Sequence, residues 1–133
     1  MKPRSILLTG LALMLLAIVL GAFGAHALKA IILPALLPIW KTASQYHFYH
    51  ALGLIALGLW AQQHASARLT TTAAYCFILG FLLFSGSLYV LAVSGLRWLG
   101  MITPVGGMFF LVGWISWIVA VIKHTGTEAD TEE

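Results

Sequence analysis

The chain consists of long apolar runs separated by short polar segments. Four of these runs approach the roughly 20 residues that an α-helix needs to cross a hydrocarbon core of ~30 Å. The pattern predicts transmembrane helices at about residues 5–24, 44–62, 72–94 and 104–123. The connections are short, so we expect one transmembrane domain over residues 1–124 and an acidic, solvated tail at 125–133. The predicted fold class is an all-α membrane protein with four transmembrane helices.

The segment between the first two predicted helices departs from this pattern. Residues 26–43 are apolar, but Pro34 and Pro38 disfavour a regular spanning helix there. The favoured interpretation is a short or kinked helix in the membrane interface, anchored by Trp40, Lys29 and Lys41. A re-entrant loop packed against the bundle is the alternative.

The first apolar run has some features of a signal peptide. Lys2 and Arg4 precede it, and Ala25-His26-Ala27 follows it. The run covers about 19 residues, however, whereas the apolar region of a signal peptide covers about 7–15. We therefore expect a retained helix.

Local signals mark the ends of the later helices. Gly95 suits the position just after a helix, because glycine adopts the left-handed conformation easily. Thr103 followed by Pro104 is typical of a helix start, with threonine as the cap and proline in the first turn.

Small residues recur at helical spacing in the first and fourth predicted helices. Such stripes allow helix backbones to approach closely in a membrane. Packing inside the bundle is the favoured role, and a dimer face is the alternative. The residues are Ala17, Gly21 and Gly24 in the first helix and Gly106 and Gly113 in the fourth.

Composition and charge agree with a membrane protein. Hydrophobic residues make up 61% of the chain and charged residues 8%, against about 25% charged in soluble domains. The lysines and arginines stand singly at the ends of the runs, so we expect no nucleic-acid partner. Lys2, Arg4, Arg68 and Lys123 fall on the side of the termini, which favours an orientation with both termini inside.

Carboxylates are confined to the end of the chain, at Glu128, Asp130, Glu132 and Glu133. Buried carboxylates are the usual carriers of proton coupling and cation binding in membranes. Their absence from the apolar runs therefore disfavours most ion-coupled mechanisms. The single cysteine, Cys76, cannot form an intramolecular disulfide, and we expect it to pack as a small hydrophobic residue.

Histidine and tyrosine carry most of the remaining chemistry. His47 and His50 share a helix face, and Tyr46 lies four residues before His50, where it can stack on the imidazole. The favoured interpretation is a polar collar of these side chains at the membrane interface. The alternative is a haem or metal ion ligated by His26 and His50, which requires the two to converge. We predict no bound cofactor.

Ser85 and Ser87 flank Gly86 in the middle of the third predicted helix. Their hydroxyls are expected to bond to backbone carbonyls or between helices. A substrate contact at a loosened helix is the alternative.

Four motifs in the chain resemble those of a known family. They are GAFGAHAL at residues 21–28, YHFYHAL at 46–52 after Trp40, FSGSLY at 84–89, and LGMITPVGG at 99–107 with Gly113-Trp114. Together they resemble the domain of unknown function 423 family, which is similar to eukaryotic transmembrane protein 256. The resemblance implies a small four-helix protein of the bacterial inner membrane with no established activity. The chain departs from the family pattern at His47, where glutamine is usual.

These observations favour a non-enzymatic membrane protein, an accessory, structural or assembly subunit of a larger complex. A small oligomeric transporter or channel is the first alternative, and a histidine-based haem or metal site is the second. The expected partners are the lipid bilayer and other membrane protein subunits, and a homo-oligomer is possible.

Overall fold

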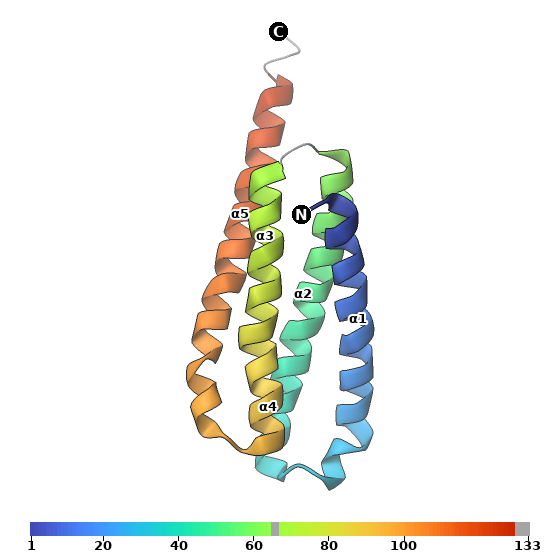
Figure 1. Ribbon diagram of the computed structural model, residues 1–133, viewed down its shortest axis with the longest axis vertical. Helices are drawn as coiled ribbons and strands as arrows, with labels where there is room; N and C mark the ends of the chain where they lie inside the picture. Colours follow the sequence, from blue (N-terminus) through green and yellow to red (C-terminus); the bar gives the residue numbers. More distant parts are fainter. Residues whose placement is uncertain (65–66, 130–133) are drawn as a thin grey trace.

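The structure is a computed structural model that describes residues 1–64 and 67–129. These residues form long, antiparallel helices joined by short turns (Figure 1). The long elements are α1 (Pro3–His26), α2 (Leu37–Gln63), α3 (Ala67–Gly80) with its continuations η3 (Phe81–Gly86) and α4 (Ser87–Ser94), and α5 (Thr103–Ala129). The turns are η1 (Leu28–Ala30), η2 (Pro34–Leu36) and η4 (Arg97–Met101).

The helices lie side by side, in the order α5, α3, α2 and α1 from left to right in Figure 1. α1 packs chiefly along α2, and α5 packs chiefly along α3 and η3. α2 also contacts α3, η3 and α4, so it joins the two pairs. The start of α1 and the end of α5 lie toward one end, and η1, η2 and η4 lie at the other.

Length and composition confirm the predicted all-α membrane fold. In the described part of the chain, residues 3–26, 68–94 and 97–124 are long and apolar enough to cross a membrane. α2 is more polar, but its 27 residues extend about 40 Å. Ten of its residues are buried by the other helices. His47 and His50 are among them, so these two imidazoles are shielded from lipid.

The segment 26–43 differs from both interpretations of the sequence. α2 begins at Leu37, and Pro38 lies in its first turn. Backbone N–H groups in a first turn have no acceptor within the helix, so the missing N–H of proline breaks no hydrogen bond there. The indole of Trp40 is buried and donates a hydrogen bond from Nε1 to the Leu20 carbonyl oxygen at 3.2 Å. The prediction of Trp40 as an interfacial anchor is therefore wrong, because this side chain joins α2 to α1.

The third helix begins at Ala67 and contains a wide π-helical turn, η3, around Ser85 and Gly86. It ends at Ser94, where Gly95 has a φ of 71° in the left-handed region, as its sequence position predicts. α5 begins at Thr103, as predicted.

α5 continues to Ala129, so the expected solvated tail is helical over 125–129. Residues 130–133 lie outside the described part of the chain.

Several glycines lie where two helices approach each other closely. A Cβ atom added to Gly106 would collide with the backbone of Phe84, and one on Gly113 would lie 2.6 Å from the Phe77 ring. In α1, a Cβ on Gly24 would collide with the Trp40 indole. Absence of a side chain at these positions allows the helices to approach.

Two further glycines, which the sequence analysis did not single out, bring α1 and α2 together. A Cβ on Gly10 would lie 2.7 Å from the Ile55 nitrogen, and one on Gly58 would lie 2.7 Å from the Leu7 nitrogen. Ala17 is buried in the same helix pair. Gly21 lies outside this contact, since no described atom comes within 4 Å of its added Cβ.

Candidate functional site

The polar residues of α2 lie deep in the bundle. His47 and His50 have exposed fractions of 0% and 6%. They follow the start of α2 by about 10 and 13 residues, so they lie roughly 15 and 20 Å along the helix. The interpretation of a polar collar at the interface is therefore wrong, because the earlier start of α2 carries both imidazoles toward its middle.

His50 is held by hydrogen bonds on both ring nitrogens. Its Nδ1 lies 2.8 Å from the Tyr46 carbonyl oxygen, and Trp114 Nε1 lies 3.3 Å from its Nε2. A carbonyl can only accept and an indole N–H can only donate, so these partners specify a neutral ring protonated at Nδ1. The imidazole also lies on the Phe110 ring, with centroids 3.4 Å apart. A metal ion at His50 Nε2 would have to displace Trp114.

Tyr46 lies one turn before His50, and their rings are stacked with centroids 6.2 Å apart. The tyrosine also contacts Phe84, with centroids 4.5 Å apart. It is 38% exposed and lies at the edge of the cluster.

His26 lies at the opposite end of this arrangement. α1 and α2 run antiparallel, with Gly10 against Ile55 and Gly24 against Trp40. His50 is therefore level with a residue about 12 positions before His26, a separation of roughly 18 Å along α1. His26 is exposed. The structure does not bring these two histidines together, and no described group of three or more His, Cys, Asp or Glu side chains could hold a metal ion.

His47 belongs to a second buried cluster. Its Nδ1 lies 3.2 Å from the Tyr89 hydroxyl, which lies 3.3 Å from Ser44 Oγ. The Tyr89 ring packs on Trp40, and the His47 ring packs on Phe81 with centroids 4.3 Å apart. His47 Nε2 has no hydrogen-bond partner among the described residues. The cluster connects α2 to η3 and α4.

The two serines of the third helix have different surroundings. Ser87 Oγ lies 2.6 Å from the Leu83 carbonyl oxygen and 3.2 Å from Thr103 Oγ1. It therefore connects the start of α4 to the start of α5. Ser85 Oγ is fully buried, and the described residues offer it no hydrogen-bond partner. The structure brings Tyr46 and His50 together, while Ser85 and Ser87 occupy the neighbouring π turn and its end.

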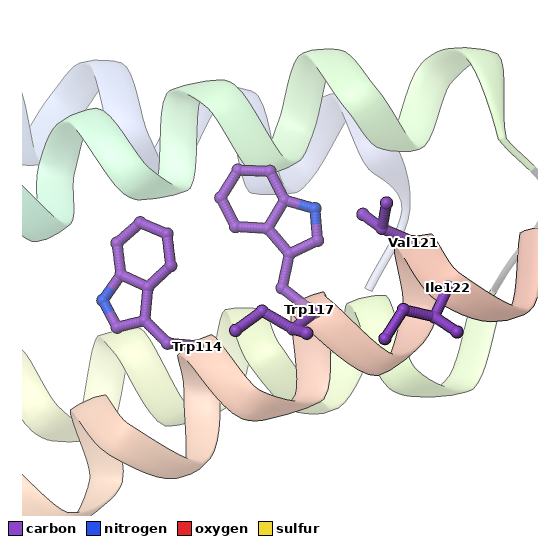
Figure 2. A pocket seen from close by; sticks show the side chains of 5 residues that line it. Trp114, Trp117, Val121 and Ile122 are labelled. Carbon is purple, nitrogen blue, oxygen red and sulfur yellow. The ribbon is translucent and has the colours of Figure 1, made fainter. Parts of the chain in front are cut away.

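A cleft of about 480 Å³ lies beside His50. Its lining includes Tyr46, Phe84, Phe110 and Trp114. Farther along α5, a smaller pocket of about 300 Å³ is lined by Trp114, Trp117, Ile118, Val121 and Ile122. Figure 2 shows the two tryptophan rings projecting from α5 toward α2. Large aromatic side chains therefore fill the space between these two helices.

Comparison with known proteins places the chain among membrane proteins. A family described as "Protein of unknown function (DUF423)" matches residues 20–107. The chain belongs to this family. The DUF423 match includes Tyr46, His50, Ser85 and Ser87, together with the start of α5.

Individual relatives agree with this family. UPF0382 membrane protein YwdK of Bacillus subtilis (strain 168) is 46% identical over 110 residues, which cover 83% of this chain and 89% of the relative. UPF0382 membrane protein SH2409 of Staphylococcus haemolyticus (strain JCSC1435) is 40% identical, covering 80% and 85%. No solved structure matches the chain.

The aromatic residues that contact His47 and His50 were not predicted from the sequence. Phe110, Trp114 and Trp117 follow one another at helical spacing in α5, and this pattern was an available signal for an aromatic face. Tyr89 gave no comparable signal, because its contact with His47 depends on how α4 packs against α2.

Proposed function

We propose that this protein is a non-enzymatic accessory, structural or assembly subunit of a larger membrane complex. The observation that carries the proposal is an outward-facing cleft of about 460 Å³ between the end of α1 and the start of α2. Its lining residues are Gly21, Gly24, Ala25, Leu37, Trp40, Lys41 and Ser44.

The chemistry of this cleft suits another transmembrane helix. Gly21 and Ala25 are four residues apart in α1, a spacing that lets a second helix backbone approach closely. No described residue occupies the space next to Gly21. Lys41 is exposed at the rim, where its ammonium group can interact with a carboxylate or with the carbonyls at a helix end.

The exposure of the outer helices supports the same proposal. In α1, the buried residues are Ile6, Gly10 and Ala17. Most of the remaining surface is apolar, including Leu15, which is 66% exposed. Lipid or a partner protein covers such a surface, and the small-residue cleft offers a specific place for the partner.

Co-purification from native membranes in a mild detergent tests this proposal. Gly21→Leu places an apolar side chain in the cleft, and its Cβ meets no described atom within 4 Å, so we expect it to release the partner while the protein remains folded. Ala22→Leu is the matched control, because Ala22 is exposed on α1 and does not line the cleft. A wild-type protein that always elutes alone, or equal partner recovery with both variants, would contradict the proposal. Recovery of only a second copy of the chain would indicate a homo-oligomer instead.

We also propose a location in the bacterial cytoplasmic membrane with both termini in the cytoplasm. The support is the excess of Lys2, Arg4, Arg68 and Lys123 on the side of the termini over Lys29, Lys41 and Arg97 on the other. Positively charged residues favour the cytoplasmic side.

A further inference from the structure

Two histidines lie together at the end of the bundle where α1 starts and α5 ends. The proposed function does not involve them. His64 directly follows α2, and His124 lies near the end of α5. Their rings meet edge to face, with centroids 4.4 Å apart and planes at 85°, so a rotation of the His124 side chain is needed for one nitrogen of each ring to face a shared ion. Both residues are partly exposed. We propose that His64 and His124 together bind a divalent transition-metal ion, with Zn²⁺ as the representative, at the membrane surface.

The His64 ring is held in an orientation that suits a metal ligand. Its Nδ1 lies 2.7 Å from the Trp60 carbonyl oxygen. Because a carbonyl only accepts hydrogen bonds, Nδ1 carries the proton and Nε2 presents its lone pair. Metal-binding histidines almost always donate their second ring nitrogen to such a partner. The ring also stacks on the Trp60 indole, with centroids 4.7 Å apart and planes 11° from parallel.

The second imidazole comes from a distant part of the chain. His124 reaches the same place from α5 and contacts Trp60 edge to face, with centroids 6.4 Å apart. Imidazole is a suitable ligand for zinc, copper and nickel. A bound ion would connect the end of α2 to α5, two helices that elsewhere meet mainly through large aromatic side chains.

The remaining coordination positions of the ion are available to water. The described residues supply no third His, Cys, Asp or Glu to the pair.

Zinc titration of the purified full chain, free of any polyhistidine tag, tests the proposal. Isothermal titration calorimetry in detergent with Zn²⁺ alone should give one saturable site. His64→Ala and His124→Ala should each weaken binding by about tenfold or more, in line with the loss of groups that support metal sites. His26→Ala is the matched control, since it removes an exposed histidine from the opposite end, and it should bind as the wild type does.

A second measurement distinguishes the loss of a zinc ligand from the loss of the folded state. Zn²⁺ should raise the thermal unfolding midpoint of the wild type and of His26→Ala, and should leave those of the other two variants unchanged, because a ligand stabilises only the state that binds it. Absence of saturable binding to the wild type would overturn the proposal. Equal affinity in all four proteins would also overturn it, by showing adventitious binding elsewhere.

Discussion

At the scale of single residues, the absence of one methyl group decides how closely two helices approach. Gly106 and Gly107 are neighbours at the start of α5, yet their surroundings differ. An added Cβ on Gly106 would collide with the Phe84 backbone, whereas one on Gly107 would lie 3.8 Å from the Phe84 ring. The first contact requires α5 to move, and the second is an ordinary van der Waals distance.

Alanine substitution at these two glycines should therefore give opposite results. We expect Gly106→Ala to destabilise the protein by about 1–3 kcal/mol, the usual cost of overpacking. Gly107→Ala should be neutral or stabilising by up to about 1 kcal/mol, because alanine favours a helix over glycine. Unfolding of both variants in mixed detergent micelles provides the measurement. Equal stability losses would show that Gly106 does not mark a close helix contact.

The hydrogen bond from Trp114 to His50 gives a second residue-scale prediction. Removing the acceptor with His50→Leu leaves a partly buried indole N–H unpaired, which costs about 1–3 kcal/mol. Trp114→Phe should then cost less in the His50→Leu background than in the wild type, with a coupling energy of about 1 kcal/mol. A double-mutant cycle of unfolding free energies measures this coupling. Additive effects would mean that the two side chains do not interact.

Residue spacing predicted part of this cluster. Tyr46 and His50 are four apart on one helix, so their contact follows from local geometry. The contacts of His50 with Phe110 and Trp114 depend on the register between α2 and α5. Spacing along one helix contains no information on that register. The alternative of a site at His26 and His50 depended in the same way on the register between α1 and α2, and the structure keeps these two histidines apart.

At the scale of elements, the burial of the polar side chains of α2 depends on the helices around it. It contains His47 and His50 and is more polar than the other long helices, but its neighbours cover both imidazoles. Phe81 of η3 packs on His47, and Phe110 of α5 packs on His50. Trp40 attaches the start of α2 to α1 through its hydrogen bond to Leu20. The α1–α2 pair should therefore loosen when this indole is removed.

Trp40→Phe tests this attachment. The variant loses the hydrogen bond and part of the buried ring, so we expect a destabilisation of about 1–3 kcal/mol. Trp98→Phe is the control, because Trp98 is 55% exposed in η4 and should change stability by less than about 0.5 kcal/mol. Thermal unfolding followed by circular dichroism compares the two. A larger loss in Trp98→Phe would contradict the assignment of Trp40 to the core.

Element ends were predictable where the signal is local. Gly95 and Thr103-Pro104 mark ends that their own backbone preferences determine. The start of α2 was not predictable in this way, since Pro38 suits either a helix start or a break. Gly86 between two serines indicated a possible loosening of the third helix, but the bounds and π-helical form of the turn at 81–86 were not predictable, because they depend on how this helix packs against α2 and α5.

At the scale of the whole molecule, the long helices of the described residues are α1, α2, the third helix and α5. They run between one end that holds the start of α1 and the end of α5 and another end that holds the short turns. Three of them are apolar enough to cross a membrane by themselves. α2 must cross as well, with its histidines covered by protein. This requirement is the central claim, because both the buried clusters and the outward cleft depend on it.

Sided cysteine labelling tests this claim most directly. In a Cys76→Ala background, single cysteines at Lys2, Ile31, Gln63 and Leu96 are treated with a membrane-impermeant maleimide in sealed vesicles. If α2 crosses the membrane, Ile31→Cys and Leu96→Cys react from one side, and Lys2→Cys and Gln63→Cys react from the other. Labelling of Ile31→Cys and Gln63→Cys from the same side would show that α2 does not cross, and it would contradict the account.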